Sequence, residues 1–264
     1  MADYSGVPIE HLGEVSSTND VARECAASVP HGWAVRADVQ TAGRGQRGHG
    51  WTSPAGGLYL SVVLKPEVPQ HLMTGVPLVC GIGAARALEG LGITDVKIKW
   101  PNDLVAGAAK LGGMLTEAGW SPEGVYAVCG IGVNMTSPQV KDPSPRALPA
   151  TGLETLMAGD APARDLGVLA DALRAGIAGT VEEWAADVKR AGTAATPLGR
   201  LGSELYDRMA FMGSYVGLID RSGNAYAAGT LTGIDLWGRA LVRLDDGTGE
   251  ERAFDPAQVS IRPL

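Results

Sequence analysis

The longest regular pattern in the sequence is an apolar repeat between residues 163 and 191. Its large apolar side chains recur every three to four positions, which is the period of an amphipathic helix. Pro162 precedes the repeat and Gly192 follows it, as is typical of the start and the end of a helix. We therefore predict one long helix over 163–191, with apolar positions at Leu166, Leu169, Leu173, Ile177, Val181, Trp184 and Val188.

The composition changes after this helix. Residues 213–262 contain short strand patterns that are separated by turn signals at 221–224, 235–238 and 245–247. Several short strands in so short a segment favour a small β-barrel. A chain of 264 residues is long enough for one medium domain and one small domain. The predicted fold class is α+β, with a mixed domain over 1–210 and an all-β domain over 211–264.

The first domain combines helix and strand patterns. A helical pattern begins around Ser17, where Ser and Thr can cap it, and is expected to end at Pro30. A second helix is predicted from about 71 to 90. The segments 41–57 and 137–162 are rich in Gly or Pro and are interpreted as loops. Strands are predicted over 33–40, 58–64, 96–100, from Leu104, over 111–117 and over 125–133.

The overall charge is acidic, with 22 Lys and Arg against 29 Asp and Glu. A net charge of −7 argues against a general nucleic-acid binder, because phosphate contact usually requires a basic surface. The three cysteines, Cys25, Cys80 and Cys129, lack paired spacing, so buried free thiols in a reducing compartment are expected. No signal-peptide pattern and no run of about 18 apolar residues is seen, so we expect a cytoplasmic protein without a membrane span.

The segment 43–50 reads G-R-G-Q-R-G-H-G and is the strongest local feature. No acidic residue lies near it along the chain, so Arg44 and Arg47 form a local cationic island. Glycines let backbone N–H groups approach a ligand, and arginine suits phosphate or carboxylate oxygens. An anion-binding loop and a solvated surface loop are both compatible with this segment alone. It also matches G-x-G-x-x-G, but Pro54 prevents the helix that a dinucleotide fingerprint requires.

Three further segments place lysine, asparagine or glycine near strand ends. The segment 99–103 reads K-W-P-N-D, which is compatible with a hairpin turn or with a site for charge stabilisation and ring recognition. In 110–117, Lys110 precedes two glycines that weaken a strand unless a ligand approaches its backbone. The segment 130–134 contains two glycines and ends in Asn. Close approach of a flat ligand explains these glycines better than packing does, and a bulge is the alternative.

These segments together resemble the biotin–protein ligase family. The motifs occur in register over about residues 12–136, and the last part of the chain resembles the family's small C-terminal domain. Lipoate ligases share the fold but lack the Arg-rich glycine loop and the K-W-P-N-D turn. The matching motifs are S-S-T-N at 16–19, Q-T-A-G-R-G-Q-R-G-H-G-W at 40–51, K-W-P-N-D-L at 99–104, K-L-G-G-M-L-T-E at 110–117 and G-I-G-V-N-M at 130–135.

The resemblance implies a class-II-synthetase-like mixed or antiparallel sheet with flanking helices, and a small C-terminal SH3-like β-barrel. It implies ATP-dependent biotinylation of a lysine on a biotin carboxyl carrier domain of a biotin-dependent carboxylase, through biotinyl-5'-AMP. Biotin and ATP are then substrates, Mg²⁺ is the expected metal with unknown ligands, and many members are homodimers. This chemistry requires that the biotin carboxylate and the ATP phosphate are aligned and that their repulsion is cancelled. That requirement explains why the motifs offer Arg and Lys rather than a His/Ser/Asp set.

The resemblance also implies a role for each matching residue. Ser17, Thr18 and Gln40 would bond the ureido ring and orient the biotin. Lys110 would lie nearest the carboxylate that is activated. The catalytic set is Arg44, Arg47, Lys99, Asp103 and Lys110. The biotin-binding set is Ser17, Thr18, Asn19, Gln40, Gly43, Arg44, Gly113, Leu115 and Gly132. The adenylate-binding set is Arg44, Gln46, Arg47, Trp51, Asn102, Lys110 and Asn134.

Two positions depart from the family pattern. Many members have arginine where this chain has Gln46, and another basic residue where it has His49. A neutral Gln46 implies that the adenylate is held less firmly, or that other cations compensate. Few residues precede the S-T-N motif, so we expect a ligase without a DNA-binding repressor module. The alternative functions are a lipoate-type acyl-protein ligase and a non-catalytic biotinyl-AMP sensor.

Overall fold

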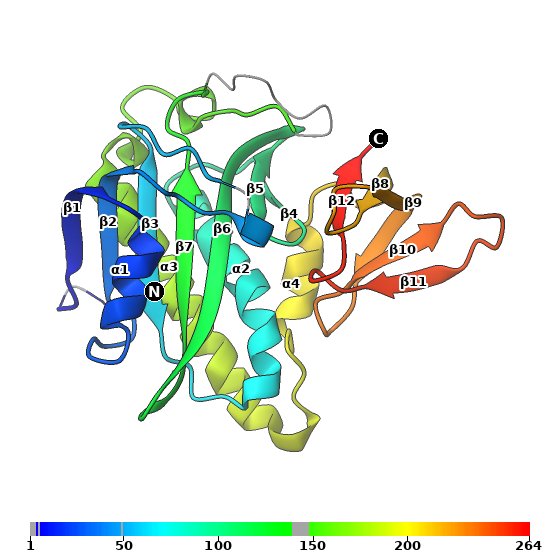
Figure 1. Ribbon diagram of the computed structural model, residues 1–264, viewed down its shortest axis with the longest axis horizontal. Helices are drawn as coiled ribbons and strands as arrows, with labels where there is room; N and C mark the ends of the chain where they lie inside the picture. The colour runs from blue at the N-terminus through cyan, green and yellow to red at the C-terminus, as the bar shows by residue number, and fades with distance from the viewer. Residues whose placement is uncertain (1–3, 5, 49, 139–147) are drawn as a thin grey trace.

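The computed structural model describes Tyr4 and residues 6–48, 50–138 and 148–264. A seven-stranded mixed sheet forms the N-terminal part, and a five-stranded antiparallel sheet forms the C-terminal part (Figure 1). In the large sheet β1 pairs with β2 in parallel, and the other neighbours pair antiparallel. This architecture confirms the predicted α+β class. The strands in spatial order are β1 (Ile9–Val15), β2 (Ala34–Gln40), β3 (Leu58–Leu64), β7 (Gly124–Val133), β6 (Ala109–Ser121), β5 (Asp103–Ala106) and β4 (Val96–Lys99).

Helices cover both faces of the large sheet (Figure 1). The helices α2 (Val76–Gly90) and α3 (Leu166–Ala191) pack on one face, and α1 (Thr18–Cys25) packs on the other. Successive residues of a strand face opposite sides, so Val62 of β3 joins the core under α2 and α3, whereas Val63 joins the core under α1. The continuous apolar sequence of β3 therefore suits a strand that is buried on both faces.

The predicted long helix is confirmed, although α3 begins at Leu166 rather than at 163. The carboxylate of Asp165 accepts hydrogen bonds from the backbone N–H groups of Gly167 and Val168, at 2.7 and 3.1 Å. Such an N-cap supplies partners for orphan N–H groups and fixes the first residue of a helix. The capping carboxylate, and not the preceding proline, therefore sets this boundary.

Other boundaries also differ from the predictions. The helix α1 ends at Cys25 before Pro30 is reached, and the hydroxyl of Ser28 donates to the carbonyl of Cys25. The predicted helix over 71–90 begins as a 3-10 helix and becomes α-helical only at Val76, just before a proline that lacks the N–H group. The strand β1 was not predicted, because its apolar residues, Ile9, Leu12 and Val15, recur every third position and not every second one.

The C-terminal sheet is open. Among the described residues no ladder joins β11 to β12, so the predicted SH3-like barrel is not confirmed. The sheet is anchored to the large one by the indole N–H of Trp100, which donates to the carbonyl of Gly238 at 2.9 Å. The short helix α4 (Leu201–Arg208) precedes it. The strands in spatial order are β11 (Glu251–Phe254), β10 (Ala240–Leu244), β9 (Ala225–Ile234), β8 (Tyr215–Ile219) and β12 (Ser260–Pro263).

One segment of the described chain is long and apolar enough to cross a membrane by length and composition. This segment, Gln70–Gly90, has a mean hydropathy of 1.3, contrary to the expectation that the sequence contains no such run. In the fold 78% of its apolar window is buried. The segment is buried between the large sheet and α3, as is typical of a helix in the core of a globular domain.

The cysteines are free thiols, as predicted. Cys80 of α2 and Cys129 of β7 are buried, and burial raises the pKa of the Cys80 thiol. Cys25 is only partly buried, contrary to expectation, because it lies at the last turn of α1, close to the surface.

His31 is a neutral, largely buried link between β3 and α3. Its Nδ1 accepts a hydrogen bond from the backbone N–H of Lys65 at 3.0 Å, so the ring carries its proton on Nε2. That Nε2 lies 3.3 Å from the carbonyl oxygen of Ala178. Burial lowers the pKa of His31 below its ordinary value of 6.5, although Ala178 and Glu182 oppose the shift.

We expect acidification to destabilise the fold through His31. Below about pH 6.5 the unfolded chain takes up a proton that the buried ring resists, so the unfolded state binds more protons and is favoured. The loss continues until the folded ring is protonated as well. Thermal unfolding of the wild-type protein and of His31→Gln, between about pH 7.5 and 5.5, checks this. Equal pH slopes for the two proteins would contradict the prediction.

Candidate functional site

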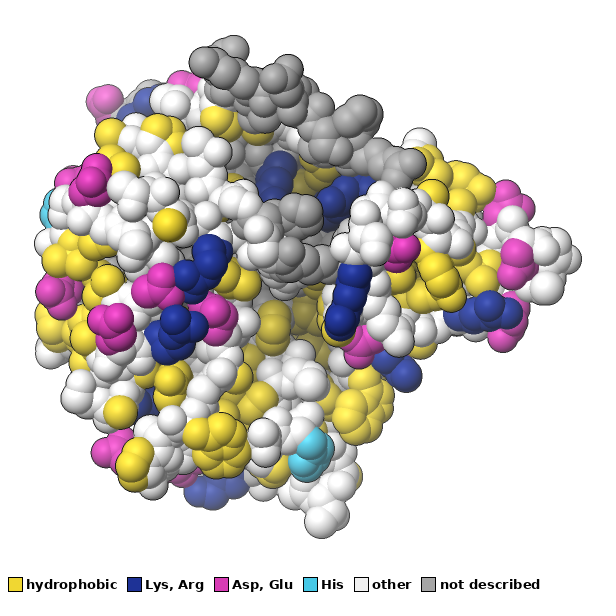
Figure 2. All heavy atoms as spheres, in the orientation of Figure 1, with side chains coloured by type: hydrophobic (Ala, Val, Ile, Leu, Met, Phe, Trp, Pro, Cys, Tyr) yellow, Lys and Arg dark blue, Asp and Glu magenta, His cyan; other side chains and the backbone are white. Residues whose placement is uncertain are grey.

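A cavity of about 440 Å³ opens where the large sheet meets the C-terminal sheet. Its volume lies in the range of roughly 300–1,000 Å³ that small-molecule sites occupy. Figure 2 shows Lys and Arg side chains around the hollowed centre of this face. Most of the predicted site residues line the cavity: Ser17, Thr18, Asn19, Gln40, Arg44, Gln46, Trp51, Lys99, Asn102, Asp103, Lys110, Gly113, Leu115 and Gly132.

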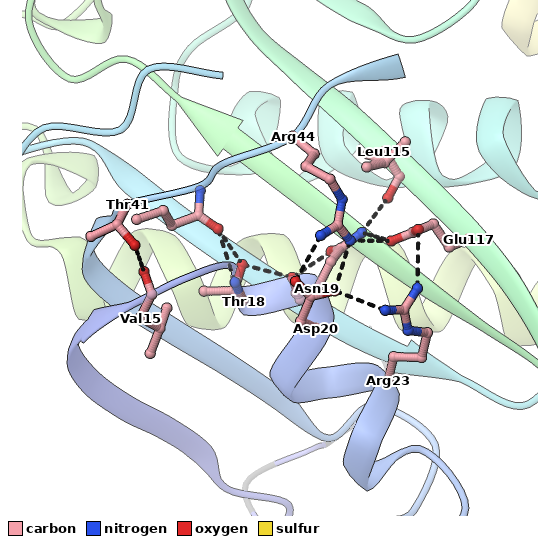
Figure 3. Close-up of polar contacts among 11 residues, drawn as sticks. Val15, Thr18, Asn19, Asp20, Arg23, Thr41, Arg44, Leu115 and Glu117 are labelled. Atoms are coloured by element: carbon pink, nitrogen blue, oxygen red, sulfur yellow. Dashed lines mark hydrogen bonds and ion pairs between the residues drawn. The ribbon is translucent and has the colours of Figure 1, made fainter. Parts of the chain in front are cut away.

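A hydrogen-bonded network supports the polar side chains at the start of α1 (Figure 3). The side-chain oxygen of Gln40 accepts from the backbone N–H of Thr18 at 2.9 Å and from its hydroxyl at 3.1 Å. Ser61 of β3, which the sequence did not single out, lies 2.8 Å from the Thr18 hydroxyl and 2.6 Å from the Asn19 side-chain oxygen. Its hydroxyl is completely buried, so it holds these two side chains in place. The result is a preorganised polar surface.

The glycines of β7 have a different cause from the one predicted. A Cβ atom at Gly130 would lie 2.1 Å from the side-chain oxygen of Asn19, and one at Gly132 would lie 2.6 Å from the indole nitrogen of Trp51. The close approach is therefore made by the protein's own side chains and needs no ligand. Because these two side chains also line the cavity, the glycines position the site indirectly.

The cationic end of the cavity contains two lysines that share one carboxylate. Asp103 Oδ2 contacts Lys99 Nζ at 2.9 Å, and Asp103 Oδ1 contacts Lys110 Nζ at 2.6 Å. Burial alone would raise the pKa of Asp103, but the two lysines outweigh it and lower the pKa to about 2. Burial lowers the pKa of Lys99, which Asp103 opposes. The side chain of Lys99 is 1% exposed and that of Lys110 is 31% exposed, so Lys110 is the more exposed of the two lysines.

Trp51 joins the glycine-rich loop to this cationic end. The ammonium of Lys110 lies 5.2 Å from the centre of the Trp51 ring, within the range of a cation–π contact. The indole N–H of Trp51 is buried and has no hydrogen-bond partner among the described residues. A buried donor without a partner is costly, so an acceptor on a bound ligand would stabilise this arrangement.

Arg44 does not stand alone as a free cation. Its guanidinium donates to both oxygens of Asp20, at 2.7 and 2.8 Å, and to Glu117 at 3.4 Å (Figure 3). The island that is cationic along the chain is thus partly neutralised by carboxylates from α1 and β6. Sequence reasoning missed both acids, because they lie 24 and 73 positions from Arg44.

Some predicted residues lie elsewhere. Gly43 packs under Trp51 and Ser53 rather than lining the cavity. Asn134 follows β7 and donates its side-chain amide to the carbonyl of Thr151 at 3.1 Å, also outside the cavity lining. Asn102 lines the cavity, with its amide donating to Met114 O at 2.5 Å. The side chain of Arg47 and the whole of His49 lie outside the described residues.

The C-terminal sheet supplies part of the lining that sequence reasoning missed. Arg221, at the turn after β8, and Ser260 and Arg262, on β12, face the same cavity as the lysines. The charge of Arg262 contributes to the lowered pKa of Lys99. No local pattern marks these residues, because only the packing of the second sheet brings them to the site.

The family model and the relatives that match this chain are all protein ligases of the same family. Residues 13–134 match the biotin/lipoate A/B protein ligase family. A biotin–[acetyl-CoA-carboxylase] ligase of Paracoccus denitrificans is 33% identical over 239 residues, which are 88% of this chain and 92% of that protein. The bifunctional ligase/repressor BirA of Escherichia coli (strain K12) is 36% identical over 144 residues, which are 54% of this chain. The matched part is 45% of BirA, so the similarity spans less than half of that relative.

Solved structures share the fold over almost the whole chain. The biotin protein ligase from Aquifex aeolicus, in complex with biotin and ATP, superposes with a TM-score of 0.73 at 27% identity, covering 97% of this chain and 99% of that one. The biotin protein ligase from Leishmania major, in complex with biotinyl-5-AMP, has a TM-score of 0.56 at 30% identity, covering 94% and 98%. By its sequence and its fold, the chain belongs to the biotin–protein ligase family.

Proposed function

We propose that this protein activates biotin with ATP and transfers it to a lysine of a biotin carboxyl carrier domain. One observation carries the proposal: a single cavity joins a preorganised polar surface around Thr18 to a cationic end around Asp103. The polar surface can form hydrogen bonds with a ureido ring, and the cationic end can bind a carboxylate and a phosphate. The relative from Paracoccus denitrificans is named for this activity, and the Aquifex aeolicus structure contains both substrates.

The proposed reaction has two steps. A biotin carboxylate oxygen attacks the α-phosphorus of ATP, the bond to the β-phosphate oxygen breaks, and pyrophosphate leaves with biotinyl-5'-AMP remaining. The neutral amine of the acceptor lysine then attacks the acyl carbon, loses a proton, and AMP leaves as the amide forms. Both steps bring anions or charged leaving groups together, so cations fixed beforehand lower the barrier.

Residues of this chain would divide the work as follows. Lys110 would neutralise the carboxylate under attack, and the buried Lys99 would hold Asp103 charged and in place. Arg44 and Arg47 would bind carboxylate and phosphate oxygens, and Trp51 would close the cavity beside the adenylate. Exclusion of water matters here, because an acyl-adenylate hydrolyses readily. All the predicted ligand contacts, those of Gly43, Asn102 and Asn134 included, stay predictions.

The side chains of the cavity are compatible with a magnesium ion that is bound mainly by the nucleotide. Among the described residues no group of three or more His, Cys, Asp or Glu side chains is suited to hold a metal. Asp103, a carboxylate of the cavity, is already paired with two lysines. Mg²⁺ commonly takes one or two carboxylates, water and substrate phosphates, so the phosphates of ATP would supply most of its ligands and it would offset their charge.

Several broader statements belong to the same proposal. The catalytic domain over 1–210 would resemble class II synthetases, and the domain over 211–264 would be SH3-like. The acceptor would be a carrier domain of a biotin-dependent carboxylase. Free thiols fit a reducing compartment, which supports a cytoplasmic location. A homodimer and the lack of DNA binding stay predictions.

Pyrophosphate release from Mg-ATP tests the proposal directly. Biotin should trigger release, lipoate in a parallel reaction should not, and an added biotin carrier domain should become labelled on lysine. Release with lipoate alone would favour the related acyl ligase. Binding of biotin without release of pyrophosphate would favour the sensor and refute the ligase.

We expect Gln46→Arg to slow the release of biotinyl-AMP. Gln46 lines the cavity and is neutral, so arginine would add a charge-assisted hydrogen bond to the adenylate. Such a bond contributes about 1.5 kcal/mol, which corresponds to roughly tenfold slower release. Gln46→Met is the matched control, because it keeps the chain length without charge. An unchanged off-rate in Gln46→Arg, or an equal slowing in Gln46→Met, would refute the role of charge.

A further inference from the structure

We propose that Asp20 is a positioning residue that holds Arg44, and with it the glycine-rich loop, in the orientation that retains the adenylate. The inference rests on the proposed function and adds a residue that the motif comparison does not single out. Asp20 lies in the first turn of α1, and Arg44 lies in the loop between β2 and β3. The ion pair between Asp20 and Arg44 connects α1 to that loop (Figure 3).

The contact between Asp20 and Arg44 is bidentate. Arg44 Nη1 lies 2.7 Å from Asp20 Oδ2, and Arg44 Nη2 lies 2.8 Å from Asp20 Oδ1. A bidentate contact fixes the plane of the guanidinium as well as its position, which a single contact does not. The side chain of Asp20 is 25% exposed and that of Arg44 is 36% exposed, so the pair is partly shielded from water. The hydrogen bond from Arg44 lowers the pKa of Asp20, so Asp20 remains charged at neutral pH.

A second carboxylate, that of Glu117, connects Arg44 to the large sheet. Glu117 of β6 lies 3.4 Å from Arg44 Nη2 and accepts from the side-chain amide of Asn19 at 2.8 Å. Arg44 is thus tied to a network that includes Asn19, one of the residues of the polar surface. Arginine has five N–H donors, so these three contacts leave donors for a ligand in the cavity that Arg44 lines.

The position of Asp20 makes it a support and not a ligand contact. Asp20 and Glu117 are absent from the cavity lining, whereas Arg44 is part of it. A carboxylate that faced the bound adenylate would repel its phosphate. One that lies behind Arg44 orients a cation without adding negative charge to the site. Preorganisation of this kind lowers the cost of ordering the loop when the ligand binds.

A double-mutant cycle with Asp20→Asn and Arg44→Gln tests the proposal. We expect Arg44→Gln to release biotinyl-AMP about tenfold faster and Asp20→Asn to release it faster by a smaller factor. The double variant should be no faster than Arg44→Gln, because Asp20 acts only through Arg44. The Michaelis constant for biotin should rise in Asp20→Asn. The first-turnover rate at saturating biotin should change less than about threefold, since Lys99 and Lys110 are intact.

Arg23→Gln is the matched control. Arg23 also contacts Asp20, at 2.9 Å, and Glu117, at 3.5 Å, but its side chain is 50% exposed and makes no ion pair with the described residues of the loop. Its removal should change the off-rate less than about twofold. Effects of Asp20→Asn and Arg44→Gln that multiply would show that the residues act independently. Tighter retention in Asp20→Asn would show that Asp20 competes with the ligand for Arg44. Either result overturns the proposal.

Limited trypsin digestion of the ligand-free protein separates this proposal from the proposed function. Cleavage after Arg47, scored by mass spectrometry, reports how often the glycine-rich loop leaves its position. Asp20→Asn should be cut several-fold faster than the wild type and Arg23→Gln should not. If the protein formed no biotinyl-AMP but showed this difference, the proposed function would fail while Asp20 still held the loop. Equal cleavage rates in all three proteins would refute the role of Asp20.

Discussion

Replacement of Lys110 by alanine should reduce biotin-dependent pyrophosphate release by about 100- to 1,000-fold, the size of effect seen when one preorganised charge-stabilising donor is lost. The ammonium of Lys110, the more exposed of the two lysines in the cavity, lies 2.6 Å from Asp103 and 5.2 Å from the centre of the Trp51 ring. Both neighbours restrain it where the carboxylate of biotin would approach the nucleotide. The effect should fall on the maximal rate more than on biotin affinity, because charge cancellation matters most in the transition state.

Initial rates at saturating Mg-ATP, with biotin affinity measured separately by calorimetry, check this prediction. Lys65→Ala is the matched control, because Lys65 contacts Glu123 and the carbonyl of Ala27 outside the cavity lining. Its activity should stay close to that of the wild type. A Lys110→Ala rate within about threefold of the wild type would assign the charge cancellation to another cation, such as Arg262.

The second large effect is expected for Lys99→Met. Lys99 is fully buried, and its removal leaves the buried carboxylate of Asp103 with one partner instead of two. Loss of one partner from a buried ion pair costs about 3–5 kcal/mol, and we expect the lower end because Lys110 still contacts Asp103. The free energy of unfolding should therefore fall by about 3 kcal/mol, and the rate of adenylation should fall with it.

The double variant Lys99→Met with Asp103→Asn separates stability from activity. Neutralising Asp103 removes the buried charge that has lost one of its two partners, so much of the lost stability should return. Pyrophosphate release should not return, because Lys110 then lacks the carboxylate that holds it in place. Denaturant unfolding and initial rates of the wild type and of the two variants provide the measurements. Recovery of activity together with stability would mean that the Lys99–Asp103 pair serves the fold alone.

Much of the large sheet could be predicted from local patterns. The helix α3, with 26 residues, follows from its helical period. The strand β3 follows from a continuous apolar run of seven residues, which has the length of a strand and not of a helix. Residues of short motifs, such as Thr18 and Lys110, line one cavity, and the resemblance to a family pointed to both of them, while their roles stay predictions. The edge strand β1 was missed, because its apolar residues recur every third position and not every second one.

The charge environment of the site was decided by the tertiary structure. Along the chain Arg44 stands in a cationic island, yet α1 and β6 bring Asp20 and Glu117 against it. Likewise the glycines of β7 accommodate Asn19 and Trp51, and Arg221 and Arg262 reach the cavity only through the C-terminal sheet. The sequence by itself determined which chemical groups are present and which family the chain resembles. Only the fold decided which opposite charges meet, because ion pairs depend on distances of a few ångströms between residues that are far apart in the chain.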